Sequence, residues 1–149
     1  MAVTRRVVNW LLGGSIAALT GAILYPVVRF ISPPDMPEAT VNQVEAGPTN
    51  DPELLENGFK IVRFGNQPVI LVRVAEDDYR AFDGVCTHLD CIVEYQQDQT
   101  RIWCNCHNGE YNLQGEVVSG PPPHALEQYQ VDLVPRSGAQ APMIVVSKT

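Results

Sequence analysis

Acidic residues are missing from the first 30 positions of this 149-residue chain, and basic residues are scarce after them. Arg5, Arg6 and Arg29 are the only charged residues before residue 31. Residues 31–149 hold the other seven of the ten bases and all seventeen acids, and seven minus seventeen gives a net charge of -10. Because proteins bind nucleic acid by neutralising phosphates with Lys and Arg, this balance makes nucleic acid a poor partner and favours a basic one.

Charge is also absent from the whole stretch Val7–Val28. At about 1.5 Å per residue in a helix, these 22 residues are long enough to cross a hydrocarbon core of about 30 Å. Trp10 and Tyr25 lie near its two ends, where aromatic rings favour the membrane interface. Arg5 and Arg6 precede it, and this placement predicts a cytoplasmic N-terminus.

A cleaved signal peptide shows a similar pattern. However, the apolar stretch is longer than an ordinary signal-peptide core, and no A-x-A-like cleavage site follows it before the prolines. We therefore predict that residues 1–30 form a retained single-pass transmembrane anchor in a bacterial-type cytoplasmic membrane, with the rest of the chain on the periplasmic side. The Thr4-Arg5-Arg6 start is also compatible with twin-arginine export, and simple positive-inside anchoring is the alternative.

No sustained helical period occurs after residue 58. Residues 31–57 contain five prolines and little periodicity, which predicts an extended linker or hinge. Beyond them, short runs rich in β-branched and aromatic residues are separated by turn residues, which is typical of an all-β domain built as an antiparallel sandwich or small barrel. The predicted strands cover residues 59–64, 69–74, 79–82, 101–103, 116–118, 129–133 and 143–146.

All four cysteines fall between residues 86 and 106, and this clustering indicates a single site. Cys86 and His88 form a C-x-H motif, and Cys104 and His107 form a C-x-x-H motif after fifteen intervening residues. In a β domain, two such short loops lie at the ends of neighbouring strands, and each offers one thiolate and one imidazole. The pattern suits two metals with one pair of ligands each, and a structural zinc site with the same donors is the alternative.

The segments 86–91 (CTHLDC) and 104–111 (CNCHNGEY) resemble the Rieske family, whose [2Fe-2S] cluster has cysteines on one iron and histidines on the other. The resemblance covers about residues 58–147. It implies a Rieske-type domain over residues 58–149 with a cluster-binding subdomain.

Position by position, the resemblance also implies roles for single residues. It places Cys86 and Cys104 on the inner iron and His88 and His107 on the outer one, with the histidines as the catalytic residues. It further implies a disulfide between Cys91 and Cys106, a hydrogen bond from Tyr111 to a ligand sulfur, and a proline-rich covering loop at residues 120–123. His124, beside that loop, is expected to be a solvated loop residue.

The second cysteine pair separates subfamilies, since Rieske ferredoxins and ring-hydroxylating oxygenases generally lack it. The resemblance is therefore to the bc and b6f branch, and a zinc site would leave Cys91 and Cys106 unexplained. It implies proton-coupled transfer of one electron from a quinol to a c-type cytochrome or plastocyanin-type acceptor. The implied partners are a cytochrome b subunit and a dimeric membrane complex. An electron-relay subunit of an arsenite oxidase-like enzyme and a non-redox, disulfide-stabilised scaffold domain remain alternatives.

The chain departs from the family motifs C-T-H-L-G-C and C-P-C-H-G-S at Asp90, Asn105, Asn108 and Gly109. Asp90 and Asn108 replace glycines, and Asp and Asn are the residues that best tolerate positive φ, so we expect both loop backbones to be kept. Gly109 lacks the serine hydroxyl that donates to a cluster sulfide in the family, and Asp90 adds a carboxylate. Both changes disfavour the reduced cluster, which predicts a low potential suited to menaquinol.

Overall fold

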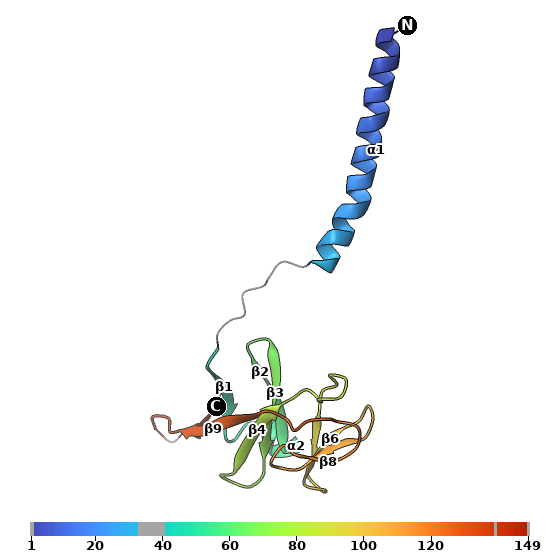
Figure 1. The fold of residues 1–149 in the computed structure, drawn as a ribbon. Helices are drawn as coiled ribbons and strands as arrows, with labels where there is room; N and C mark the ends of the chain where they lie inside the picture. The colour runs from blue at the N-terminus through green and yellow to red at the C-terminus, as the bar shows by residue number, and fades with distance from the viewer. Residues whose placement is uncertain (1, 33–40, 139, 149) are drawn as a thin grey trace. The chain divides into compact units, whose positions relative to one another are not determined.

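The computed structural model describes residues 2–32, 41–138 and 140–148. The chain divides into two compact units, Met1–Pro37 and Glu38–Thr149, and each is described by itself. The first unit holds one helix, and the second holds all the strands and one short helix (Figure 1).

Helix α1 (Ala2–Ile31) confirms the helix expected at the start of the chain. Its segment Val3–Ile31 has a mean hydropathy of 1.8 and is long and apolar enough to cross a membrane. Pro26 lies inside the helix, where it removes one backbone N–H donor. The side chains described along α1 are exposed, as expected for a helix whose apolar surface would face lipid.

The second unit contains a six-stranded, barrel-like antiparallel sheet and a smaller four-stranded one. The order in the large sheet is β1 (Gln43–Pro48), β10 (Met143–Ser147), β9 (Gln128–Val134), β4 (Tyr79–Asp83), β3 (Gln67–Arg73) and β2 (Phe59–Phe64). The order in the small sheet is β5 (Glu94–Gln96), β6 (Arg101–Cys104), β7 (Gly109–Tyr111) and β8 (Val117–Ser119). This architecture confirms the predicted all-β antiparallel domain, and the structure adds that the domain has a second, smaller sheet.

Strand β3 separates two hydrophobic cores, because successive side chains of a strand point to opposite faces. Val69 and Leu71 belong to a core inside the large sheet. Ile70 and Val72 belong to a second core, which also contains Tyr111 and faces the small sheet. These four residues of β3 are fully buried, so the small sheet packs against a well-packed part of the large sheet.

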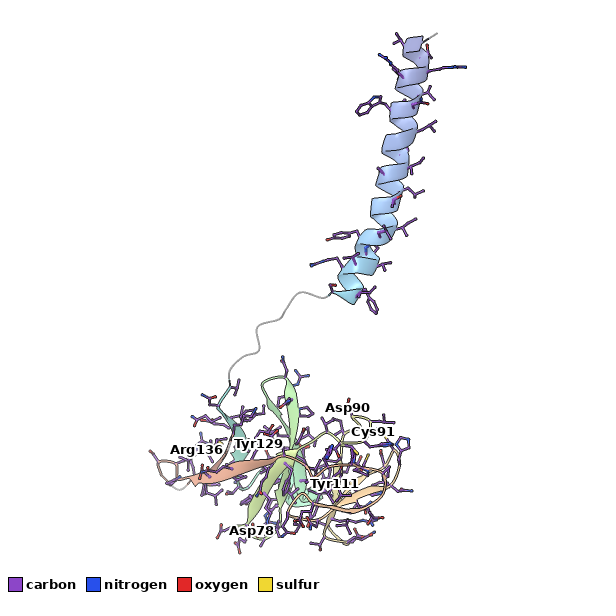
Figure 2. The ribbon with its side chains drawn as sticks, viewed as in Figure 1. Asp78, Asp90, Cys91, Tyr111, Tyr129 and Arg136 are labelled. Carbon is purple, nitrogen blue, oxygen red and sulfur yellow. A yellow bond between two sulfur atoms is a disulfide. The ribbon has the colours of Figure 1, made fainter. Side chains whose placement is uncertain are left out.

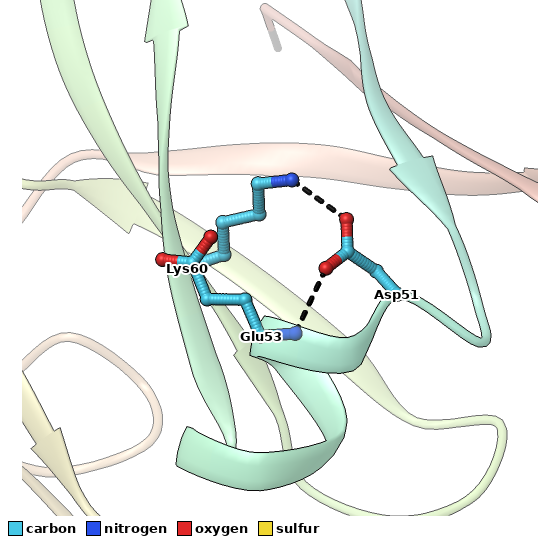
Figure 3. A network of polar contacts seen from close by, with 3 residues as sticks. All are labelled: Asp51, Glu53 and Lys60. Carbon is cyan, nitrogen blue, oxygen red and sulfur yellow. Dashed lines mark hydrogen bonds and ion pairs between the residues drawn. The ribbon is translucent and has the colours of Figure 1, made fainter.

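Helix α2 (Pro52–Asn57) begins with strong local signals. The Asp51 carboxylate accepts a hydrogen bond from the backbone N–H of Glu53 at 3.0 Å and forms an ion pair with Lys60 at 2.7 Å (Figure 3). Proline follows at the first helical position, where its missing N–H costs nothing. Gly58 ends the helix in the left-handed conformation, with φ 74°.

The structure differs from the sequence prediction between residues 43 and 57. This stretch was predicted as part of the linker, yet β1 pairs with β10 and α2 is anchored to β2 through the ion pair of Asp51 with Lys60. The folded unit therefore includes these residues. The linker prediction for residues 33–40 lies outside the described residues.

Candidate metal centre

Two loops at one end of the small sheet bring the predicted site residues together. The first loop, residues 86–91, is closed at its base by the isolated bridge between Val85 and Ile92 and by the Cys86 N–H, which donates to the Cys91 carbonyl at 2.8 Å. The second loop is the turn between β6 and β7, whose register pairs Cys104 with Gly109. Each loop is thus held by strand pairing, which gives its side chains fixed positions.

The loops are joined by a disulfide between Cys91 and Cys106. In Figure 2, Asp90 and Cys91 lie close together, and Arg136 lies on the opposite side of the domain. The pairing implied by the resemblance is therefore present. It leaves Cys86 and Cys104 as the two free, buried thiols.

The free thiols and the two histidines form the donor set. The rings of His88 and His107 come from different loops and meet edge to face, with their centroids 4.8 Å apart. Nδ1 of His88 is buried without a hydrogen-bond partner among the described residues, which is costly for a polar atom unless a ligand satisfies it. Two thiols and two imidazoles offer four donor atoms for iron at this place.

Burial raises the pKa of the Cys104 thiol, and the neighbouring Cys86 sulfur adds to the rise. A thiol in this setting keeps its proton unless a metal cation replaces it, because coordination deprotonates thiols outright. The sulfur atoms of Cys91, Cys104 and Cys106 also lie within 4.8 Å of one another. Since Cys91 and Cys106 are bonded to each other, only Cys104 of these three has a free thiol.

Tyr111 lies beneath the first loop and is fully buried. Its hydroxyl is 3.4 Å from the Cys86 sulfur, as the resemblance implies. Burial, followed by the contact with Cys86, raises the pKa of Tyr111 to about 12, so the phenol keeps its proton at neutral pH. It is therefore available as a hydrogen-bond donor.

The proline-rich loop packs against the second ligand loop. A Cβ atom on Gly109 would lie 2.7 Å from Cγ of Pro122, and one on Gly120 would lie 2.6 Å from the Asn108 carbonyl oxygen. Thr87 connects the same loop to the first ligand loop, because its hydroxyl donates to the His124 carbonyl at 2.8 Å. This role of Thr87 could not be predicted from the sequence, because the two residues in contact are 37 positions apart. The His124 side chain is exposed, as expected.

Comparison with known proteins agrees with this geometry. The model of the family described as the Rieske [2Fe-2S] domain matches residues 42–130. This chain belongs to the Rieske [2Fe-2S] family. Its cofactor is a Rieske [2Fe-2S] cluster, and the donor set of buried thiols and unpartnered imidazole nitrogen fits it.

Two curated relatives are cytochrome b6-f complex iron-sulfur subunits. The chain is 37% identical to that of Chlorobaculum tepidum over 83% of its own length and 66% of the relative's. It is 33% identical to that of Chlorobaculum thiosulfatiphilum over 93% of its own length and 71% of the relative's. It therefore spans about two thirds of the length of these proteins.

Two solved structures share the fold. The cyanobacterial plasma membrane Rieske protein of Synechocystis PCC 6803 has a TM-score of 0.57 at 24% identity, over 70% of this chain and 98% of that one. The ferredoxin of carbazole 1,9a-dioxygenase from Nocardioides aromaticivorans IC177 also has a TM-score of 0.57, at 17% identity, over 72% of this chain and 99% of that one. The fold is thus shared by proteins with different names and roles, and the function rests on other features.

Proposed function

We propose that the chain is the Rieske subunit of a cytochrome b6f- or bc-type complex and transfers electrons one at a time from a quinol to a c-type cytochrome or plastocyanin-type acceptor. The observation that carries this is the disulfide between the two ligand loops, in a chain that also has an apolar helix long enough to span a membrane. The named relatives support it, because both are subunits of cytochrome b6-f complexes.

The proposed ligands are Cys86 and Cys104 on one iron and His88 and His107 on the other. When bound, the cluster supplies a one-electron acceptor of raised potential, because two neutral imidazoles replace two thiolates. A neutral imidazole that binds iron through one nitrogen carries a proton on the other, so that second nitrogen can accept a proton from a quinol only after it has lost its own. His107 is the more exposed of the two histidines, so we propose that His107 is the one that contacts the hydroxyl of a bound quinol.

In this assignment, the deprotonated nitrogen of His107 would accept one proton of the quinol as one electron leaves it. The second electron would pass to a cytochrome b subunit and the second proton to water, so each quinol would give up two electrons and two protons. The N-terminal helix would anchor the chain with its N-terminus in the cytoplasm and the domain on the periplasmic side, as Arg5 and Arg6 predict. Residues 31–42 would then act as a tether within a dimeric complex.

Two substitutions at histidines test the site. His107→Ala should lose iron, the reduced-state EPR signal of a Rieske cluster, and quinol consumption. His124→Ala is the matched control, because the His124 side chain is exposed and only its backbone carbonyl takes part in the site. If His107→Ala retains the iron stoichiometry and turnover of the wild type, the assignment fails.

The partners are tested by mild-detergent purification of the full chain. A cytochrome b together with a c-type haem protein should co-purify with it. Recovery of a molybdenum enzyme instead would support the alternative of an arsenite oxidase-like relay. A protein with neither iron nor an EPR signal would support the non-redox scaffold.

We further propose menaquinol as the substrate, because Asp90 and the missing serine at Gly109 both disfavour the reduced state. If one hydrogen bond to the cluster is worth about 1 kcal/mol between redox states, its loss lowers the potential by roughly 40 mV. A redox titration should place the midpoint below that of ubiquinol-oxidising relatives. A value at or above about +250 mV, near the upper end of the Rieske range, would contradict this choice of quinol.

A further inference from the structure

The Tyr111 hydroxyl has three polar neighbours and only one proton. The backbone N–H of Thr87 donates to it at 3.1 Å, which occupies one lone pair of the phenol oxygen. The remaining neighbours are the Cys86 sulfur at 3.4 Å and Oγ1 of Thr87 at 3.1 Å. An iron-bound thiolate has no proton to give, so it accepts only. The Cys86 sulfur and the Thr87 oxygen therefore compete as acceptors for the single hydroxyl proton of Tyr111.

The threonine hydroxyl is fixed as an acceptor toward Tyr111 by its other contact. Its own proton is directed to the His124 carbonyl oxygen at 2.8 Å, and a carbonyl oxygen can only accept. Thr87 thus has no proton left for Tyr111, while its lone pairs are open to the phenol. Both Tyr111 distances lie within the normal range for their atom types, because hydrogen bonds to sulfur are longer than those to oxygen.

We propose that Thr87 is a positioning residue that sets the redox potential by competing with the Cys86 sulfur for the single proton of Tyr111. This rests on the proposed ligand role of Cys86. A donor to a ligand sulfur stabilises the reduced, more negative cluster and raises its potential. Whenever the Tyr111 hydroxyl donates to Thr87, it does not donate to the Cys86 sulfur. The cluster potential is therefore lower with Thr87 present than it would be if the sulfur were the only acceptor for Tyr111.

The proline-rich loop takes part in this arrangement through one atom, the His124 carbonyl oxygen. That oxygen accepts the hydroxyl proton of Thr87, so Oγ1 of Thr87 can only accept a hydrogen bond from Tyr111. The loop is held on its other side by the contact of Pro122 with Gly109. The position of the covering loop therefore affects the sulfur through Thr87 and Tyr111.

Four variants of the full-length chain in detergent test the inference, with the midpoint potential measured at fixed pH by EPR-monitored titration. Thr87→Val keeps the shape of the side chain and removes its acceptor oxygen. The reduction equilibrium should therefore shift about threefold toward the reduced form, which raises the midpoint potential by about 30 mV at 59 mV per tenfold. Thr87→Ser retains the hydroxyl and should match the wild type. In a Tyr111→Phe background, Thr87→Val should cause no further change, because no contested proton remains.

The inference is overturned if Thr87→Val lowers the potential or leaves it unchanged, or if its effect persists without the Tyr111 hydroxyl. Should Thr87→Val fail to load the cluster, Thr87→Ala is expected to show the same rise. If neither loads while Thr87→Ser does, the residue is structural and the inference fails. A wild-type chain without the EPR signal would instead defeat the proposed function, and this inference with it.

Discussion

At the scale of single residues, the two ligand loops keep a backbone shape that normally needs glycine. Asp90 has φ 58° and Asn108 has φ 56°, both in the left-handed region. Asp and Asn visit this region more readily than other L-residues, because their short side chains form local hydrogen bonds. Both residues thus adopt the positive φ that we expected them to tolerate, and Asp90 places a carboxylate on the first ligand loop.

A serine at Gly109 should destabilise the domain unless Pro122 is also changed. Because a Cβ there would lie 2.7 Å from Pro122 Cγ, Gly109→Ser and Gly109→Ala should each lower the free energy of unfolding by about 1–3 kcal/mol. Pro122→Ala should relieve both. In that background the serine variant should have a midpoint about 40 mV above the alanine variant, through a donor to the cluster. Equal midpoints in the paired titration would show that the hydroxyl does not reach a cluster atom.

Asp51 should stabilise the domain in a pH-dependent way. The hydrogen bond from Lys60 lowers the pKa of Asp51 below its ordinary 3.8, so the folded state binds its proton less readily than the unfolded state. The stabilisation is therefore complete above about pH 4 and is lost as the pH falls through the folded value. Asp51→Ala should cost about 1 kcal/mol of unfolding free energy at neutral pH, the usual worth of a helix N-cap.

Urea unfolding at several pH values measures this effect. Asp51→Asn serves as the control, since an asparagine can still cap α2 but cannot form the ion pair (Figure 3). The difference between wild type and Asp51→Asn should shrink as the pH falls through the lowered pKa of Asp51 in the folded state. A difference that stays constant over this range would show that the charge of Asp51 contributes nothing.

At the scale of elements, the strands could be predicted where hydrophobic patterning is local. The predicted run 59–64 coincides with β2, and the run 143–146 falls one residue short of β10. β1 was missed, because it forms by pairing with β10, whose residues lie about a hundred positions away. The three-residue strands β5 and β7 are too short to show a period, and they exist because β6 pairs with both.

Helix α2 was missed although its sequence carried the signal. Asp51 followed by proline at the first helical position, with Gly58 at the end, is a recognised start and stop pattern. The site, too, was predicted only in part. The donor residues were visible from their types and spacing, whereas the role of Thr87 depends on a loop that folds back over it.

Removing the disulfide should weaken the coupling between the two ligand loops. Cys91 and Cys106 are 15 positions apart, and a cross-link closing a loop of that size stabilises a fold by about 3 kcal/mol. We expect the double variant Cys91→Ser/Cys106→Ser to lose close to that amount without the cluster. The loss should be smaller with the cluster bound, because its ligands cross-link the same loops.

Chemical unfolding of cluster-free and cluster-loaded protein, followed by circular dichroism, measures the two losses. The single variants Cys91→Ser and Cys106→Ser are informative controls, since each removes the cross-link and leaves one new free thiol. If the loaded and cluster-free forms lose equal stability, then the ligands do not hold the loops together as proposed.

At the scale of the whole molecule, the acidic surface and the apolar helix belong to different units. Residues 31–149 carry the net charge of -10 and also contain every buried apolar residue of the described chain, from Ala46 to Val146. Both hydrophobic cores are built entirely from β-domain side chains. The stability of the domain and its attachment to a membrane should therefore be separable properties.

A chain beginning at Glu38 tests that separation. It should fold with the full chain's thermal midpoint to within about 2 °C, since no buried core side chain is removed, and it should bind the same cluster with an unchanged reduced-state EPR signal. Attachment to the membrane should be lost: the full chain should remain with the membrane fraction after carbonate washing, whereas the shortened chain should be recovered in the wash.

A matched full-length variant with Leu11, Ile16 and Leu19 changed to Arg keeps the length but loses the apolar surface of α1. It should also be recovered in the wash, because a central Arg costs roughly 2.5–3.5 kcal/mol in a membrane. If that variant remains with the membrane after washing, then attachment resides in the β domain and the anchor role of α1 is wrong.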